Sequence, residues 1–121
     1  AALNAGWNKW IATGLPWVIA KAGLTLDGRI NSPPGERWIT SAASRRDAMH
    51  LRARVQAILV GGETVRTDNP RLTIRGVAHR EQPWRVVWTR RGELPAGCHL
   101  LTDAFRERTL VFRRRPLRDV L

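Results

Sequence analysis

Short apolar runs separated by polar segments are the main pattern along this chain. They occupy residues 17–21, 57–60, 85–89 and 109–112, and glycine, proline or polar residues lie between them. Runs of this length predict strands, and the unbroken apolar character of 57–60 is typical of a buried strand in a parallel sheet. We expect 85–89 to be a second buried strand and 109–112 a third, while residues 71–75 alternate like the end of a strand.

A helix is predicted between the first two of these strands. Thr40 or Ser41 can cap it, and it should run to about Val55. One face of this helix is expected to pack on the sheet, with Ser44, Ala48, Leu51 and Val55 in a stripe at helical spacing. Arg46, His50 and Arg54 would point into solvent, whereas Arg45 and Arg52 lie at the border of the stripe, where a long side chain can reach a cleft.

Helical segments also follow the later strands. Residues 64–68 predict a short helix, and Pro116 is suited to begin another, in which Leu117, Val120 and Leu121 start an apolar stripe. Strands alternating with helices predict an α/β fold with a mostly parallel sheet flanked by helices. An isolated helix usually needs about 12 residues or more, so we expect the natural protein to continue past Leu121 and the fold to be incomplete at the C-terminus.

Composition narrows the class of protein. With 121 residues, 43% of them hydrophobic, the chain fits one small domain. No apolar run approaches the roughly 20 residues of a membrane span, and no secretory signal is evident, so a cytoplasmic protein without membrane contact is expected. Cys98 is the single cysteine and no Cys or His cluster has metal-ligand spacing, so neither a disulfide nor a metal site is predicted.

The formal charge of +11 raises the possibility of nucleic-acid binding. The arginines are spread from Arg29 to Arg118, and none of the known nucleic-acid-binding motifs occurs among them. A solvated basic surface with one site for an anionic ligand is therefore the favoured interpretation.

Several motifs allow both a structural and a functional interpretation. Gly61-Gly62 before Thr64 could present backbone amides to a phosphate at a helix N-terminus, but paired glycines are more often a structural turn, and no third glycine follows at Rossmann spacing. Asp27-Gly28 is a turn dipeptide. Trp38 could pack in the core or stack on a ligand, and Asp68 could cap an amide or accept a ligand hydroxyl.

In order along the chain, these segments resemble a known family. The strings Lys21-Ala-Gly-Leu-Thr-Leu-Asp-Gly-Arg-Ile30, Gly35-Glu-Arg-Trp-Ile-Thr40 and Asp68-Asn-Pro-Arg-Leu-Thr-Ile-Arg75, with Leu51-Arg52, 57–61 and Thr64, resemble the reductase domain of the riboflavin-biosynthesis deaminase/reductase. The resemblance covers about residues 7–89. Residues 6–14 are similar to the segment that joins the deaminase to the reductase.

The resemblance implies a dihydrofolate-reductase-like fold and an enzyme that uses NADPH. The implied reaction is hydride transfer to the ribosyl C1′ of 5-amino-6-(5-phosphoribosylamino)uracil, which yields the ribitylamino product. Matching positions imply NADPH contacts at Gly23, Trp38, Thr64 and Asp68, and substrate contacts at Arg52, Leu72 and Arg75. Lys21 matches a lysine that reaches the sugar or pyrimidine and is the catalytic candidate, as a proton donor or by orienting the ring-opened imine; alternatively it is a lysine snorkelling at a strand edge.

The chain also departs from the family pattern. The family has Gly-Glu-Ser-X-Trp where this chain has Gly35-Glu36-Arg37-Trp38, one residue shorter and without the serine, so the resemblance does not imply the substrate hydrogen bond of that serine here. Arg90, beside Arg91, replaces a common serine and could pair with the NADPH 2′-phosphate or lie in solvent. The Glu-Gly-Gly motif and the deaminase zinc motif do not occur in the chain.

The resemblance implies that the chain has two parts. Residues 1–15 are expected to be a linker or docking arm from a preceding deaminase-type domain, and 16–121 the first half of a reductase domain. The alternative function is a non-catalytic fragment, or a binding or dimerisation module of that family, because an unfinished sheet leaves open edges. We expect a homodimer.

Overall fold

The structure, a computed structural model, describes residues 4–31, 35–36, 38–90 and 92–113. The chain forms two compact units, Ala1–Ser41 and Ala42–Leu121. The predicted division of the chain after residue 15 stays a prediction. The helix expected from Pro116, together with Arg37 and Arg91, lies outside the described residues.

The first unit begins with helix α1, Ala5–Thr13, within the segment expected to be a linker or docking arm. Gly14 ends this helix in the left-handed conformation, with φ of 66°, and its N–H donates to the carbonyl of Trp10. Trp7 and Trp10 are both more than half exposed. The Asp27-Gly28 turn is confirmed, since the Thr25 N–H donates to the Arg29 carbonyl and Gly28 has a φ of 82°.

The strand predicted over residues 17–21 is not formed. These residues carry no strand or helix assignment, and Val18 is 75% exposed. An apolar run becomes a strand only when a neighbouring strand accepts and donates its backbone hydrogen bonds. No described residue forms such a ladder with 17–21, so the prediction was wrong for this structure.

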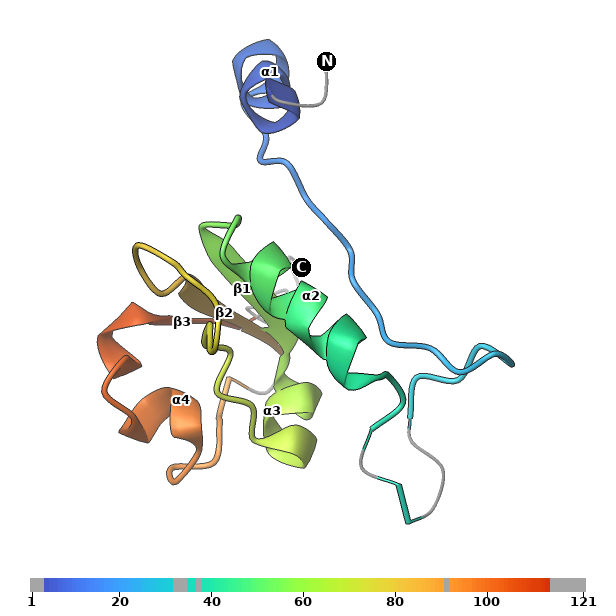
Figure 1. The fold of residues 1–121 in the computed structure, drawn as a ribbon. Helices are drawn as coiled ribbons and strands as arrows, with labels where there is room; N and C mark the ends of the chain where they lie inside the picture. The colour runs from blue at the N-terminus through green and yellow to red at the C-terminus, as the bar shows by residue number, and fades with distance from the viewer. Residues whose placement is uncertain (1–3, 32–34, 37, 91, 114–121) are drawn as a thin grey trace, which may run out of the picture. The chain divides into compact units, whose positions relative to one another are not determined.

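The second unit contains the sheet and most of the helices. Its elements are α2 (Ala42–Arg52), β1 (Ala57–Gly61), α3 (Gly62–Asp68), β2 (Trp84–Thr89), α4 (His99–Thr102), the 3₁₀ turn η2 (Arg106–Arg108) and β3 (Thr109–Arg113). The strands are parallel in the order β1-β2-β3, and Leu59, Val86 and Leu110 lie in register. The predicted α/β fold with a parallel sheet is therefore confirmed (Figure 1).

One face of this sheet carries the core. Each connection, from β1 to β2 and from β2 to β3, leads to the next strand on the same side along the sheet. Because such connections are right-handed, α3 and α4 lie on the same face of the sheet. Val65 of α3, Val87 of β2 and Leu100 of α4 meet there at 1% exposure or less. Leu72 and Cys98 complete the buried cluster, against which Ile58, Val60 and Leu94 pack. Cys98 is a free thiol buried in this cluster.

The opposite face of the sheet is exposed. Leu59 is 62% exposed, Trp88 59% and Phe112 53%. The prediction that 57–60 and 85–89 are buried strands therefore holds for one face only. In the described part of the unit, α3 and α4 both lie on the core side of the sheet. Since side chains alternate between the two faces along a strand, every second side chain points to the exposed face.

Helix α2 largely matches its prediction but is shorter. It ends at Arg52 rather than near Val55. Ala48, Leu51 and Val55 are half-buried, Ser44 is exposed, and Arg46, His50 and Arg54 are exposed as expected. Arg45 and Arg52, predicted at the border of the packed face, are both of intermediate burial.

Candidate functional site

The segment from Arg71 to Arg75 follows α3 and is the centre of the candidate site. Leu72, Thr73 and Ile74 are buried, at 4%, 6% and 3% exposure, yet no strand forms, so the predicted strand end was wrong. Buried peptide groups need partners. Side chains supply them here in place of a neighbouring strand: Arg85 and Arg52 donate to the carbonyls of Arg71 and Thr73, and Gln82 pairs with Ile74.

Arg52, predicted to contact substrate, binds the segment that carries Arg75, the second arginine with that prediction. Arg52 ends α2 and donates from Nη1 to the Thr73 carbonyl at 2.9 Å. Burial lowers the pKa of Arg52 below its usual value, and the charge of Arg75 lowers it further. Within the described part of the chain neither guanidinium has an ion-pair partner. Two guanidinium groups that repel each other form a favourable place for an anion.

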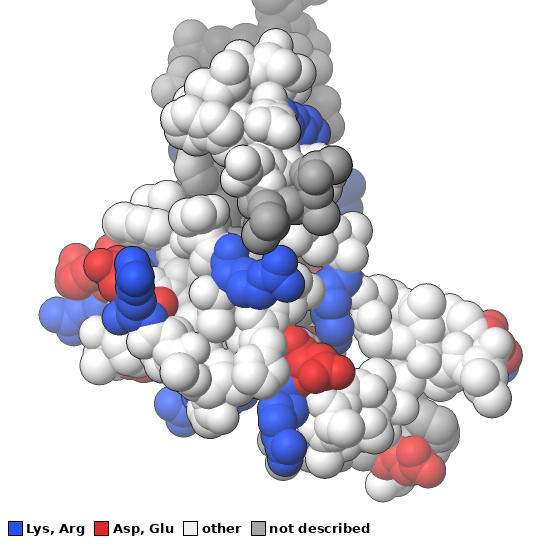
Figure 2. Space-filling model, turned by 45° about the horizontal axis from the view of Figure 1, so that its top comes forward, with Lys and Arg blue, Asp and Glu red and all other residues white. Residues whose placement is uncertain are grey.

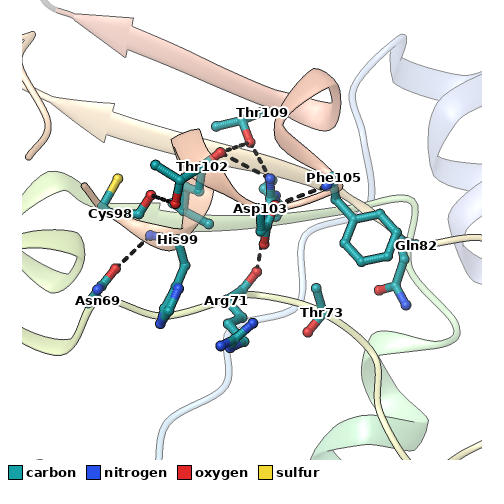
Figure 3. Close-up of polar contacts among 12 residues, drawn as sticks. Asn69, Arg71, Thr73, Gln82, Cys98, His99, Thr102, Asp103, Phe105 and Thr109 are labelled. Carbon is teal, nitrogen blue, oxygen red and sulfur yellow. Dashed lines mark hydrogen bonds and ion pairs between the residues drawn. The ribbon is translucent and has the colours of Figure 1, made fainter. Parts of the chain in front are cut away.

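Thr64 and Asp68, both predicted NADPH contacts, lie four residues apart on α3 and therefore share one face of it. Both are exposed. The backbone contact expected of Asp68 belongs instead to Asn69, whose Oδ1 accepts from the His99 N–H at 2.8 Å (Figure 3). Asn69 also caps α3 in the left-handed conformation.

Leu72, a predicted substrate contact, is buried in the core rather than exposed. It belongs to the buried core cluster, and its φ of 52° is unusual for a residue other than glycine. Such backbone strain persists only where the surroundings impose it. Its predicted substrate contact remains a prediction.

The glycines that precede α3 have distinct roles. A Cβ on Gly62 would lie 2.6 Å from Cβ of Thr89 on β2, whereas a Cβ on Gly61 would meet nothing within 4 Å. Gly62 is therefore required by close helix-to-strand packing, which supports the structural interpretation of this turn. Gly61 faces open space.

The remaining predicted residues lie in the first unit. Lys21 is exposed, and its Nζ is 4.0 Å from the position of a Cβ on Gly23, so these two positions are adjacent. Trp38 is 54% exposed, which disfavours the interpretation as a core residue. Because Lys21, Gly23 and Trp38 belong to one unit and the other five residues to the second, their assembly around one ligand stays a prediction.

Sequence analysis did not find the buried arginine of β2. Arg85 is 1% exposed and forms an ion pair with Asp103 at 2.7 Å. Its Nη2 donates to the Leu100 carbonyl and to Oγ1 of Thr109, so the backbone of Arg71 and the side chains of Asp103 and Thr109 converge on one guanidinium. The alternation of inward and outward residues along β2 could have indicated its burial, because Arg85 lies on the same face of the strand as Val87 and Thr89.

Other predictions concern the surface. The face shown in Figure 2 carries Lys and Arg in separate patches divided by uncharged and acidic residues, which is unlike a continuous nucleic-acid-binding surface. His50 and His79 are exposed, and His99 is half-buried. Arg90 is also exposed, which is compatible both with an ion pair to a ligand phosphate and with a position in solvent. In the ranges that the structure describes, no acidic, histidine or cysteine group could hold a metal ion, and no helix is long and apolar enough to cross a membrane.

Comparisons with known proteins agree with this architecture. The family model described as the RibD C-terminal domain matches residues 16–119. The riboflavin biosynthesis protein RibD of Bacillus amyloliquefaciens is 42% identical over 102 residues, covering 84% of this chain and 28% of that protein. RibD of Chlamydia muridarum is 45% identical over 92 residues, covering 73% of this chain and 25% of that protein. The chain therefore spans about a quarter of the length of these relatives.

Solved structures show the same similarity. Acinetobacter baumannii RibD has a TM-score of 0.77 at 33% identity, over 97% of this chain and 38% of that one. A Thermotoga maritima diaminohydroxyphosphoribosylaminopyrimidine deaminase/5-amino-6-(5-phosphoribosylamino)uracil reductase has a TM-score of 0.75 at 32% identity, over 92% of this chain and 31% of that one. With its matching sequence, its parallel sheet and its fold, the chain belongs to the RibD C-terminal domain family.

Proposed function

We propose that this chain forms part of the site of an NADPH-dependent reductase that converts 5-amino-6-(5-phosphoribosylamino)uracil to its ribitylamino product. Family membership supports this, as does the reductase activity named for the Thermotoga maritima relative. The observation that carries the proposal is that Arg52 donates a hydrogen bond to the Thr73 carbonyl, two residues before Arg75, so one short segment fixed by side-chain hydrogen bonds connects the two arginines.

The substrate phosphate is the ligand we assign to this pair. A phosphate monoester offers several acceptor oxygens and about two negative charges near neutral pH, which suits two guanidinium donors. Arg52 is anchored to Thr73 through Nη1, so it is held in place before the ligand arrives. Preorganised donors lose less conformational freedom on binding.

The cofactor assigned to the other side of the site is NADPH, which supplies the hydride for C1′ when it is bound. The residues present fit this group in that Thr64 and Asp68 are exposed on one face of α3 and the turn at Gly61 opens to empty space. Gly23 and Trp38 are the proposed contacts from the first unit. Lys21, exposed and next to Gly23, is the proposed donor of the proton that accompanies reduction.

Phosphate capture is directly testable. Replacing Arg75 with alanine should weaken the binding of ribose 5-phosphate by about 10- to 100-fold, because one charge-assisted hydrogen bond is worth about 1.5–3 kcal/mol. Isothermal titration at low salt measures this. Arg80→Ala is the matched control, since Arg80 is exposed on the same connection. Equal weakening in both variants, or no binding of either ribose 5-phosphate or the phosphoribosylaminouracil to the parent chain, would contradict the assignment.

The alternative function, a binding or dimerisation module, is favoured by one specific observation. The sheet face that bears Leu59, Trp88 and Phe112 is apolar and exposed, and exposed apolar patches are typical of association sites. We propose a homodimer through this face. Light scattering should give twice the chain mass, and Trp88→Lys should restore the single-chain mass because a buried charge without a partner is unfavourable. A parent chain that remains monomeric at high concentration would contradict the dimer.

We also propose a cytoplasmic location and a small-molecule substrate rather than nucleic acid. Cys98 is buried as a free thiol, as is common for proteins of reducing compartments.

A further inference from the structure

We propose that Gln82 is a positioning residue, which holds the Arg71–Arg75 segment in place so that Arg75 keeps its position two residues after the Thr73 carbonyl that binds Arg52. The role of Gln82 in fixing the segment is independent of the ligand; only the consequence for phosphate rests on the proposed function. Gln82 lies on the connection just before β2 and is of intermediate burial.

The contact replaces a missing strand. The Ile74 N–H donates to Oε1 of Gln82 at 2.7 Å, and Nε2 of Gln82 donates to the Ile74 carbonyl at 3.1 Å. One carboxamide thus pairs with both peptide groups of a residue that is 3% exposed. A neighbouring strand would make the same two bonds. Without Gln82 both groups would be buried with no described partner, which is unfavourable.

The orientation of the carboxamide follows from the donors around it. A peptide N–H can only donate, so the atom facing Ile74 N must be the oxygen, and Nε2 then faces the Ile74 carbonyl. Nε2 also lies 2.9 Å from Nε2 of His79, which must accept, and Nδ1 of His79 lies 3.0 Å from the Val77 carbonyl, to which it must donate. The His79 tautomer that carries its proton on Nδ1 satisfies every contact, so Gln82 contacts Ile74 on one side and His79 on the other.

The position of Ile74 makes this contact important for the arginine pair. Arg52 binds the carbonyl of Thr73, the residue before Ile74, and Arg75 is the residue after it. Gln82 therefore fixes the one residue that lies between Thr73, to which Arg52 is anchored, and Arg75. Repulsion between the two guanidinium groups favours their separation, and the left-handed backbone of Leu72 adds local strain to the same segment. The segment needs such a restraint to hold its conformation.

The test compares Gln82→Met with Gln56→Met. Methionine has a similar length but cannot pair with Ile74, and Gln56 is an exposed glutamine just before β1. Amide hydrogen exchange of Ile74 should accelerate at least about tenfold in Gln82→Met, because a buried N–H loses its acceptor, and should not change in Gln56→Met. Exchange at Val87, in the core of β2, should not change in either variant, which separates local positioning from global destabilisation.

The second readout is the affinity for inorganic phosphate, measured by titration. We expect Gln82→Met to weaken it about tenfold and Gln56→Met to leave it unchanged. Unaltered exchange at Ile74, or equal acceleration at Ile74 and Val87, would overturn the role of Gln82. Faster exchange at Ile74 with unaltered phosphate affinity would overturn its effect on Arg75. If the parent chain binds no phosphate, the proposed function fails, and the exchange rates alone decide whether Gln82 fixes the segment.

Discussion

Asp103→Ala should lower the free energy of unfolding by about 3–5 kcal/mol, because removing one partner of a buried ion pair leaves an uncompensated buried charge. Arg85 is 1% exposed and Asp103 13% exposed in their side chains. The guanidinium of Arg85 also donates hydrogen bonds to the carbonyls of Arg71 and Leu100 and to Thr109. Loss of the Asp103 carboxylate should therefore weaken the connections before and after β2. Urea unfolding followed by circular dichroism measures the change.

The effect should also depend on pH. Burial, the largest single influence, favours a raised pKa for Asp103, but hydrogen bonds from Arg85 and the Phe105 N–H, with the charges of Arg85 and Arg71, outweigh it and lower the pKa. A lowered pKa in the folded state contributes stability above the unfolded value of about 3.9, and that stability is lost as pH falls through the folded value. The unfolding midpoints of the parent and Asp103→Ala should therefore converge in acid.

Glu107→Ala is the control for this variant. Glu107 pairs with Arg106 on the surface, where the two side chains are 87% and 67% exposed. Exposed pairs contribute little to stability, so we expect almost no change. If Glu107→Ala and Asp103→Ala unfold at the same urea concentration, the buried network is not a principal source of stability.

Gly62→Ala should cost about 1–3 kcal/mol of stability through overpacking. The added Cβ would lie 2.6 Å from Cβ of Thr89 and 2.7 Å from its Oγ1. A Cβ cannot rotate away, so α3 or β2 must shift. Gly61→Ala is the matched control, since its Cβ would meet nothing within 4 Å and its φ of −74° is ordinary for alanine. Thermal unfolding of both variants checks this; equal melting temperatures would contradict the close packing.

Much of the local structure could be predicted from the sequence because it depends on short-range patterns. The apolar runs at 57–60, 85–89 and 109–112 became strands, and periodicity located α2 and the border position of Arg52. The Asp27-Gly28 turn follows from the backbone freedom of glycine, whereas Gly62 is required because a Cβ there would lie 2.6 Å from Cβ of Thr89. The ordered motifs from Lys21 to Arg75 indicated the family that the comparisons confirmed.

Other predictions failed where the outcome depends on residues distant in the sequence. Residues 17–21 and 71–75 have the composition of strands, but neither finds a neighbouring strand in the described chain. The difference between them is tertiary, because 71–75 obtains its hydrogen bonds from Arg52, Gln82 and Arg85. No local pattern specifies such partners, since they come from a helix, a loop and a strand.

The sequence by itself determined the three parallel strands, helices α2 and α3, the Asp27-Gly28 turn and the family to which the chain belongs, since these depend on periodicity, backbone preference and motif order. Only the tertiary structure decided that one sheet face carries the core, that Arg85 is buried with Asp103, and that Arg52 binds the segment that carries Arg75. Burial and charge proximity are properties of three-dimensional neighbours, so identical residues would behave differently on another surface of the fold.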